Sequence, residues 1–386
     1  MTAPAASRRR PHRRRATALT PWLVPLLGLA LAACGGTTTD AGTSGSATTA
    51  SSAGSTPAFT PATSGTLRLY TWSDYIPQKL VDRFSKETGI RMSVDYYDSN
   101  ETLEAKLKAS GGKGYDLVVP SDYMVQTLRN ENLLQEFDAT SLPNGKNVGG
   151  SFLDVYFDPG RKFSVPYLYG TTGYAYDPAV VKTPMKTWKD YFSAPAAAKG
   201  KIGIFNDQVD GINAALRAVG GEPCTTDPAK LQAAQDLLVS FKASVATINS
   251  DGIIDRMQAG ESPLSMIWNG AAHRVKAKKK DVVYVYPTEG MTLWQDNFAI
   301  PSGAENVAQA KTFLNWFMDP KNAAEAANAQ GYNSGITGVD DLLSPQMRQD
   351  PAVVPPAEAA ALARPVKPCT AAELNNYSKI WERFKA

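Results

Sequence analysis

Short apolar runs alternate with amphipathic helical runs from residue 66 to the C-terminus, and this alternation constrains the fold more than any single motif. One helical run begins after Pro77 and ends at Gly89, residues that suit a helix start and a helix end. Leu80, Val81 and Phe84 line one face of it. The alternation predicts an α/β fold with mostly parallel sheets. The strands expected after the first one are 91–97, 117–119, 201–205, 264–268, 282–285 and 298–300.

The segment is long enough for two domains with separate cores. Two stretches, 167–172 and 294–297, interrupt the alternation with aromatic and small residues, and we expect them to be loops that cross between the domains. A helix that opens at Asp227 and Pro228 lies between these crossings. Both domains would therefore be discontinuous in sequence.

Polar and aromatic residues follow two of the expected strands at the point where each strand ends. After the third strand come Ser121, Asp122 and Tyr123. Ligands gather at the carboxyl ends of strands in α/β sheets, so this pattern predicts a binding surface. The alternative is that the rings close a core and that the Ser and Asp side chains cap helices. The first strand, which begins at Leu67, is followed by Trp72, Ser73, Asp74 and Tyr75.

Carboxylates and rings recur at other strand ends. Together they suit an aliphatic polyamine, because each ammonium needs a charge-assisted acceptor and each methylene stretch needs an apolar wall. Trp and Tyr rings supply both the wall and a cation-π face. Asp207 and Asp210 could instead cap a helix, and Trp268 could belong to a core. The residues in question are Asp207, Asp210, Trp268, Trp294, Asp296 and Tyr332.

Catalytic signatures are missing from the sequence. Beyond residue 33 the single histidine is His273, so no second histidine exists for a two-His metal site or a His-Glu-x-x-His helix. Neither a Walker loop nor a Gly-x-Ser-x-Gly motif is present. We therefore expect no enzyme activity, no cofactor and no metal site.

Six arginines between Arg8 and Arg15 precede an apolar run, 22–33, that is too short to span a bilayer as a helix. This pattern is typical of a secretory signal. The run ends in Leu-Ala-Ala-Cys34-Gly, which looks like a lipobox, so we expect residues 1–33 to be a lipoprotein signal peptide and Cys34 to be acylated. The protein would then be anchored to the outer face of the cytoplasmic membrane. The alternative is an ordinary signal in which Cys34 is incidental.

Removal of residues 1–33 would change the formal charge from +3 to −3, because 34 Lys and Arg would then stand against 37 Asp and Glu. The remaining chain thus has no basic excess that would favour nucleic acid. Residues 34–65 consist mostly of Gly, Ser, Thr and Ala, which cannot bury a core, and we expect a flexible tether there.

The chain has three cysteines. If Cys34 carries lipid, Cys224 and Cys369 are an even pair in an oxidising compartment. They would either form a disulfide that ties the tail to the second domain or stay as two free thiols.

Four motifs strongly resemble those of the spermidine/putrescine-binding proteins of bacterial ABC importers, and the similarity continues nearly to the C-terminus. They are Leu-Tyr-Thr-Trp-Ser-Asp-Tyr-Ile-Pro, Phe-Ser-Lys-Glu-Thr-Gly-Ile, Ser-Asn-Glu-Thr-Leu-Glu-Ala-Lys-Leu and Tyr-Asp-Leu-Val-Val-Pro-Ser. The resemblance implies a two-lobed periplasmic-binding-protein fold of type II, each lobe a mixed, mostly parallel sheet flanked by helices, with a hinge and a ligand cleft. Lobe 1 would comprise 66–170 and 295–340, and lobe 2 would comprise 171–294 and 341–386.

The resemblance also implies a function. The protein would be a monomeric substrate-binding lipoprotein that captures a polyamine and delivers it to an ABC permease. Asp207 would take a terminal amine with Asp210 beside it, and Asp296 would take the inner amine. The implied ligand-binding residues are Trp72, Ser73, Asp74, Tyr75, Ser121, Tyr123, Asp207, Asp210, Trp268, Trp294, Asp296 and Tyr332.

Three departures from the family concern selectivity. Asp210 stands where spermidine-specific members are expected to have Glu, and Ala271 stands where putrescine-selective members have Asp. A Gln expected near the tail has no clear counterpart around 371–376. We expect spermidine to be favoured over putrescine. The alternatives are a receptor for another cation or for a ferric complex held by tyrosines, and a surface hydrolase on the same scaffold.

Overall fold

The structure is a computed structural model that describes residues 59–365 and 369–386. The predicted signal peptide, the predicted lipid attachment at Cys34 and most of the predicted tether lie outside the described residues. Within those ranges, no helix combines the length and the apolar composition that crossing a bilayer requires.

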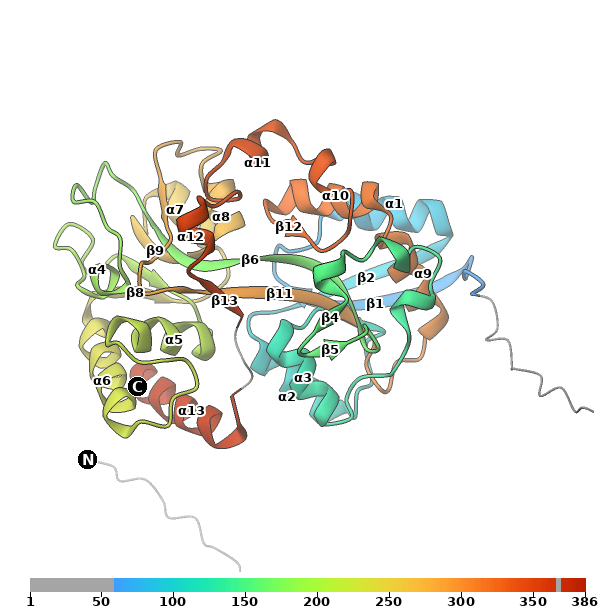
Figure 1. The fold of residues 1–386 in the computed structure, drawn as a ribbon, viewed down its shortest axis with the longest axis horizontal. Coiled ribbons are helices and arrows are strands. Elements are labelled where there is room, and N and C mark those ends of the chain that lie inside the picture. The colour runs from blue at the N-terminus through green and yellow to red at the C-terminus, as the bar shows by residue number, and fades with distance from the viewer. Residues whose placement is uncertain (1–58, 366–368) are drawn as a thin grey trace, which may run out of the picture. The chain divides into compact units, whose positions relative to one another are not determined.

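Eleven strands of the described segment form one mixed sheet (Figure 1). Its main path follows the order β2 (Ile90–Tyr97), β1 (Gly65–Trp72), β3 (Leu117–Val118), β11 (Met291–Ala299), β6 (Ser164–Tyr176), β9 (Leu264–Trp268), β7 (Ile202–Ile204) and β8 (Val245–Ile248). Off this path, β10 (Val283–Val285) and β12 (Asn333–Ser334) pair with β6, and β13 (Ala363–Pro365) pairs with β11. A separate hairpin pairs β4 (Asp154–Val155) with β5 (Asp158–Pro159).

The stretches 167–172 and 294–297 are parts of strands, so the prediction that they are loops is wrong. They lie in β6 and β11, which pair antiparallel with each other. Both strands are buried along almost their whole length. A strand that is buried on both faces loses the alternation of apolar and polar residues, which explains the interrupted pattern. Because β6 pairs antiparallel with both β11 and β9, the sheet is antiparallel at its centre, whereas the strand pairs toward its two ends are parallel.

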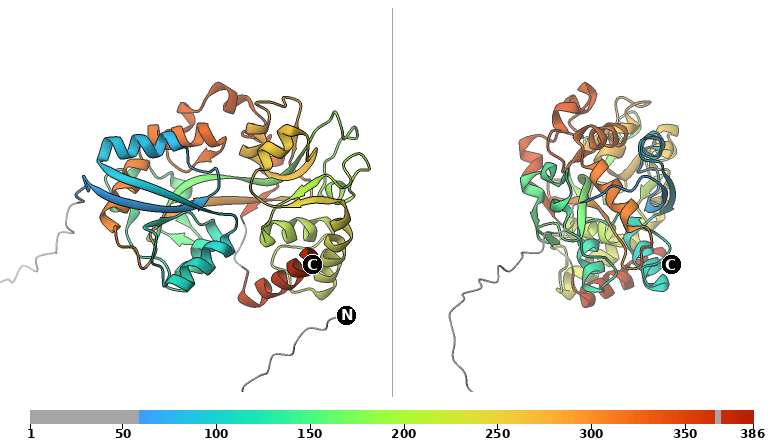
Figure 2. Two further views of the ribbon diagram at one scale, coloured as in Figure 1. Left: turned by 180° about the vertical axis from the view of Figure 1, so that it is seen from behind. Right: turned by 90° about the vertical axis from the view of Figure 1, so that its right-hand side faces the viewer.

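Two predicted helices are confirmed, and helices flank the sheet at both ends (Figure 2). α1 (Gln78–Thr88) begins after Pro77 and ends at Gly89, whose φ of 76° suits glycine. α6 (Pro228–Phe241) begins after Asp227, whose side chain accepts a hydrogen bond from the Ala229 amide. The other α-helices are α2 (Asn100–Ser110), α3 (Asp122–Asn130), α4 (Trp188–Phe192), α5 (Gln208–Ala218), α7 (Ile253–Ala259), α8 (Asn269–Val275), α9 (Val307–Phe317), α10 (Pro320–Gln330), α11 (Pro345–Gln349), α12 (Ala357–Ala360) and α13 (Ala371–Lys385).

Two large apolar cores lie toward opposite ends of β6 and β11 (Figures 1 and 2). The first core draws on residues within 67–168 and 294–353, and the second draws on residues within 174–285 and 352–384. Trp268 packs against both cores. Each core is therefore assembled from segments far apart in sequence, and β6 and β11 connect the two.

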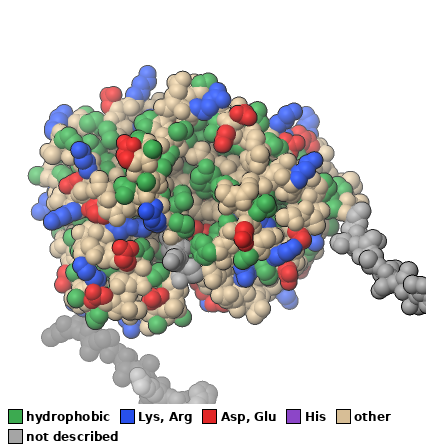
Figure 3. Space-filling view, viewed as in Figure 1, with side chains coloured by type: hydrophobic (Ala, Val, Ile, Leu, Met, Phe, Trp, Pro, Cys, Tyr) green, Lys and Arg blue, Asp and Glu red, His purple; other side chains and the backbone are tan. Residues whose placement is uncertain are grey.

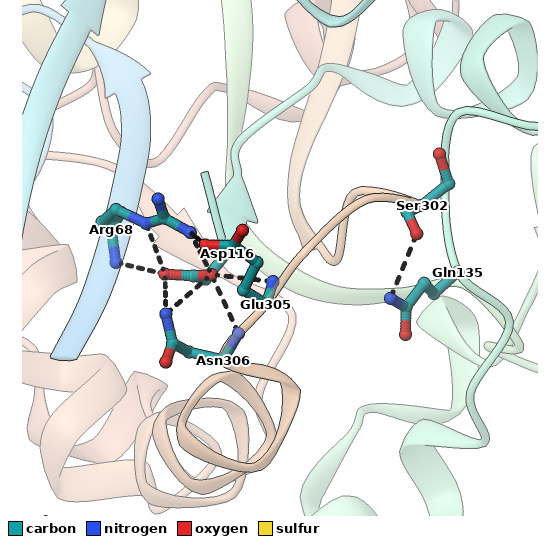
Figure 4. Close-up of polar contacts among 6 residues, drawn as sticks. All are labelled: Arg68, Asp116, Gln135, Ser302, Glu305 and Asn306. Carbon is teal, nitrogen blue, oxygen red and sulfur yellow. Dashed lines mark hydrogen bonds and ion pairs between the residues drawn. The ribbon is translucent and has the colours of Figure 1, made fainter. Parts of the chain in front are cut away.

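A buried carboxylate is fully paired in the first core (Figure 4). Asp116 accepts hydrogen bonds from the Arg68 amide at 2.9 Å, from the Arg68 guanidinium at 3.1 Å and from Asn306 at 3.1 and 3.2 Å. Arg68 also reaches Glu305 at 2.9 Å. Burial alone would raise the pKa of Asp116, but the Arg68 and Asn306 donors outweigh it and hold that pKa below its usual value.

The C-terminal helix is tied to the second core. The structure joins Cys224 and Cys369 in a disulfide with Cα atoms 5.1 Å apart. Tyr377 of α13 donates a hydrogen bond of 2.7 Å to Asn213 of α5. The disulfide connects the segment before α6 to the segment before α13.

Acidic and basic side chains are interspersed over the face drawn in Figure 3. On that face the described residues form no continuous basic surface of the kind that binds nucleic-acid phosphates.

Candidate functional site

A cavity of about 360 Å³ lies where segments of the two cores meet. This size is within the usual range for a small-molecule site. Its walls come from the loop after β1, the first turns of α3 and α5, the segment 250–258, α8 and the cavity face of β11. The structure brings all of the predicted ligand-binding residues to this one cavity: Trp72, Ser73, Asp74, Tyr75, Ser121, Tyr123, Asp207, Asp210, Trp268, Trp294, Asp296 and Tyr332.

Asp296 projects into the cavity from β11 and is only 6% exposed. Its carboxylate accepts a hydrogen bond of 2.6 Å from the Ser121 hydroxyl. Burial raises the pKa of Asp296 to about 7, and the Ser121 and Tyr75 hydroxyls only partly oppose this shift. A buried carboxylate whose donors are all neutral is stabilised when a cation approaches it.

Asp207 and Asp210 lie at the N-terminus of α5. Asp207 is the N-cap, since its carboxylate accepts a hydrogen bond of 2.9 Å from the Asp210 amide. The capping alternative is therefore correct for Asp207, although the same side chain also lines the cavity. Burial and the neighbouring Asp210 raise the pKa of Asp207 to about 7. Burial raises the pKa of Asp210 to about 6 despite the Thr172 hydroxyl at 2.9 Å.

Two groups of aromatic rings form apolar walls. Trp72 and Trp268 meet edge to face with ring centroids 6.2 Å apart, and Trp268 stacks on Phe205 at 4.2 Å. Trp294 and Tyr332 meet edge to face at 5.1 Å. Trp268 thus serves a core and the cavity at once. The ring faces offer both a hydrophobic wall and a cation-π surface.

Asn100 organises the hydroxyls of the cavity, and the sequence-based prediction missed it. It is 1% exposed, and its side-chain amide donates to the Ser121 hydroxyl at 3.1 Å and to the Tyr123 hydroxyl at 3.0 Å. In the sequence Asn100 looks like part of the cap that Ser99 provides for α2. The Ser-Asn-Glu-Thr motif was the one signal that could have identified it.

Other lining residues were also missed. Asp122 is 2% exposed, and burial raises its pKa well above the usual value, with the charges of Asp296 and Asp210 adding to the shift. The strand-end pattern included Asp122, but the family motif did not assign it a role. Residues 250–255, which lead into and begin α7, line the cavity together with Gln258, and the sequence-based prediction assigned them no role.

Asp74 differs from the other carboxylates of the cavity. Its side chain is 74% exposed, and its carboxylate lies 2.8 Å from the guanidinium of Arg274 in α8. This ion pair joins the loop after β1 to α8 across the cavity. The sequence analysis did not identify Arg274, because nothing in a helix pattern indicates a partner so far away in the chain.

The remaining reactive side chains do not form a catalytic or metal centre among the described residues. His273 accepts or donates a hydrogen bond of 2.7 Å with Asp350, and neither residue lines the cavity. Within the described ranges, the one group with the spacing of metal ligands is Cys224, Cys369 and Glu373, and its cysteines form the disulfide. The carboxylates and rings of the cavity together form surroundings that suit a cation with apolar segments.

Comparisons with known proteins agree with this chemistry. A family model described as bacterial extracellular solute-binding protein matches residues 79–356. The chain is 36% identical over 298 residues to the spermidine/putrescine-binding periplasmic protein of Escherichia coli (strain K12), covering 76% of this chain and 84% of that protein. It is 32% identical over 314 residues to the putrescine-binding periplasmic protein PotF of the same strain, covering 77% and 85%. The solved spermidine/putrescine ABC transporter substrate-binding protein PotD of Streptococcus pneumoniae matches with a TM-score of 0.68 at 30% identity, covering 83% of this chain and 99% of that one.

Proposed function

The chain belongs to the bacterial extracellular solute-binding protein family, and from this membership we propose that it is the polyamine-binding component of an ABC importer. Its fold is the two-lobed type II periplasmic-binding-protein fold that the sequence resemblance predicted. The similar proteins described above are solute-binding proteins, not enzymes. In this proposal the cavity captures a protonated polyamine, which the protein then delivers to a membrane permease.

The observation that carries the proposal is a set of three cavity carboxylates: Asp207 and Asp296 are buried, and Asp210 is half-buried near the charge of Arg217. The pKa values of Asp207, Asp210 and Asp296 are all raised, chiefly by burial. An ammonium group placed beside each would provide the missing charge-assisted hydrogen bond. Ring faces beside the intervening methylenes would add roughly 0.5 to 2 kcal/mol for each good cation-π contact.

We assign roles to these carboxylates along an extended ligand. Asp207 binds one terminal amine, with Asp210 beside it, and Asp296 binds the inner amine. The rings of Trp72 and Trp294 contact the methylene segments between the charged nitrogens. The arrangement matches a chain of separated positive charges better than a single compact cation.

The two cores support a hinged mechanism. We propose lobe 1 as 66–170 with 295–340, and lobe 2 as 171–294 with 341–386. β6 and β11 carry the chain between the cores, so these strands are the proposed hinge. Closure would then bury the ligand between the lobes.

We further propose that acylated Cys34 and a tether over 34–65 hold the monomeric protein at the outer face of the cytoplasmic membrane. Anchoring through two acyl chains on Cys34 would be stable, because each buried methylene contributes about 0.8 kcal/mol. A flexible tether would let the folded part reach the permease.

We propose that spermidine is favoured over putrescine. The role assigned to Asp296 requires an inner amine, which spermidine has and putrescine lacks. Ala271 lines the cavity and adds no further charge at its position. The similar proteins bear names for both ligands, so the preference depends on this chain's own residues.

A ferric receptor fits the cavity less well. Iron would require several phenolates with oxygen or imidazole ligands that converge on one point, and the histidine of the described residues, His273, does not line the cavity. The carboxylates and the interleaved Trp rings favour the polyamine instead.

The test is a tryptophan fluorescence titration of the full chain, stripped of ligand by unfolding and refolding. Saturable binding of spermidine at micromolar or lower concentration, with weaker binding of putrescine, is expected. Trp294→Phe should weaken binding, whereas Trp316→Phe is a matched control because Trp316 lies in α9 against Glu87 and outside the cavity. A folded protein that binds neither amine by fluorescence or calorimetry would refute the proposal.

A further inference from the structure

Arg161 is fully buried, which is rare for arginine, and lies just before β6. Its guanidinium is held by side-chain oxygens: Nη1 lies 3.1 Å from Ser164 Oγ and 2.7 Å from Asn297 Oδ1, and Nη2 lies 3.3 Å from Gln295 Oε1. Its Nε donates to the carbonyl of Phe152. Taking a guanidinium out of water is unfavourable unless its donors are satisfied, and here two of its four acceptors, Gln295 and Asn297, belong to β11.

A buried carboxylate is linked to Arg161 through the Ser164 hydroxyl. Asp158 is fully buried, and its carboxylate accepts a hydrogen bond of 2.7 Å from the Ser164 hydroxyl. The same hydroxyl oxygen accepts from Arg161. Burial lowers the pKa of Arg161 to about 10, and the nearby Asp158 charge opposes that shift. The guanidinium is therefore fixed in place by a connected polar network.

The two amides that Arg161 holds flank Asp296. The register of β11 with β6 shifts between Gln295 and Asn297, where Asp296 lies opposite two residues of β6, Tyr167 and Leu168, so β6 carries the extra residue of a β-bulge. The Asn297 side-chain amide donates to the Gln295 carbonyl at 2.8 Å and so joins the two residues on either side of Asp296. Trp294 and Asp296 line the cavity, whereas Gln295 and Asn297 reach Arg161 on the other face. Bulges of this kind redirect a side chain.

We propose that Arg161 is a positioning residue for ligand recognition: it clamps Gln295 and Asn297 so that β11 holds the Asp296 carboxylate toward the ligand. Arg161 is not among the residues that line the cavity, so it acts through Asp296. The identity of the ligand rests on the proposed function above, whereas the clamp itself rests on the contacts of Arg161.

The test combines Arg161→Gln with Asp296→Asn in the full chain. Arg161→Gln is expected to lower the affinity for spermidine about tenfold by calorimetry, and to change it less than about twofold in the Asp296→Asn background, because residues that act through one group are not additive. Arg68→Gln is the matched control. It breaks the Asp116 cluster in the same core, so it should lower the melting temperature and leave affinity unchanged.

Equal losses in both backgrounds, or an unchanged affinity in folded Arg161→Gln, would overturn the proposal. If Arg161→Gln does not fold, Gln295→Met removes one acceptor of the clamp. About a threefold loss that vanishes in the Asp296→Asn background would support the clamp, and no loss would overturn it.

A second readout needs no ligand. The pKa of Asp296, followed by NMR of its carboxyl carbon, is expected to shift in Arg161→Gln and to stay unchanged in Arg68→Gln. An unchanged pKa in both would overturn the clamp. If wild-type protein binds no polyamine but the pKa of Asp296 shifts as expected, the proposed function fails and the clamp stands.

Discussion

Asp116 and Asp296 are both buried carboxylates of elements that build the first core, yet their surroundings differ. Asp116 is fully buried and receives donors from Arg68 and Asn306, which hold its pKa below the usual value against the effect of burial. Asp296 is 6% exposed, is hydrogen-bonded by Ser121, and has a pKa raised by burial to about 7. Burial is similar at the two positions, so the charge of the donors decides whether the pKa of the carboxylate is lowered or raised. Asp116 has a cationic partner within the fold, whereas the donor to Asp296 is a neutral hydroxyl, and in the proposed function a ligand ammonium would be its cationic partner.

The largest effect is expected when the charge of Asp296 is removed, which should change ligand affinity and not stability. Asp296→Asn should lower spermidine affinity about 100-fold, the equivalent of roughly 3 kcal/mol for a lost charged hydrogen bond. Its free energy of unfolding at pH 8 should not fall, because a poorly paired buried charge is removed. Calorimetry and urea denaturation measure the two quantities.

Asp116→Asn should show the reverse. Arg68 would lose its buried partner, so the free energy of unfolding should fall by roughly 1 to 3 kcal/mol while affinity stays unchanged. Weaker ligand binding in Asp116→Asn, or equal destabilisation in Asp296→Asn, would break the comparison between a structural and a binding carboxylate.

A second prediction separates the two roles of Asp207. Asparagine caps a helix about as well as aspartate, so Asp207→Asn should keep the start of α5 and lose only the charge. Affinity should then fall roughly tenfold or more, with stability unchanged. Asp207→Ala should lose similar affinity and, in addition, about 1 kcal/mol of stability. Wild-type affinity in Asp207→Asn would mean that capping is its sole role.

The third prediction concerns pH. Burial raises the pKa values of Asp207 and Asp296 to about 7, above the ordinary value of about 3.9. In the ligand-free protein their contribution to stability is therefore fully present below about pH 4 and is lost as the pH rises through about 7. Asp116, with a lowered pKa, has the opposite sign, and its contribution is lost as the pH falls below about 4.

Ligand affinity should follow the ionised form of the cavity carboxylates. Between pH 8 and pH 6 the affinity for spermidine should fall about tenfold, and binding near pH 6.5 should release protons. Calorimetry in two buffers of different ionisation enthalpy measures that release. Asp116→Asn should leave this pH profile unchanged, and a flat profile in the wild-type protein would contradict the raised pKa values.

The smallest effect is expected at the exposed ion pair. Asp74 is mostly in solvent, so its pairing with Arg274 at 2.8 Å contributes at most about 1 kcal/mol to the stability of this arrangement. Arg274→Met should lower affinity about twofold to fivefold, and the difference should shrink at high salt. A loss above about tenfold would show that Asp74 or Arg274 contacts the ligand itself.

Local patterns were sufficient for a good part of the fold and of the cavity. The α1 helix follows from its apolar spacing with Pro77 and Gly89 at its ends, and the strand over 264–268 has the bounds that were predicted. The side chains at strand ends were identifiable because the carboxyl edge of a sheet gathers them, and all of those assigned to the ligand line one cavity. Periodicity, capping and strand-end position are properties of neighbouring residues, so sequence determines them.

Only the tertiary structure decided which partners those residues have. β6 was not recognised as a strand, and β11 was recognised only at its end by the strand predicted over 298–300, because burial on both faces removed the alternation. Asp116 and Asp296 both lie beside or within apolar strands, and nothing near either in sequence tells that Arg68 completes the first while Ser121 donates to the second. The pKa of a carboxylate depends on burial and on donors brought from distant segments, and those distances exist only after the chain has folded.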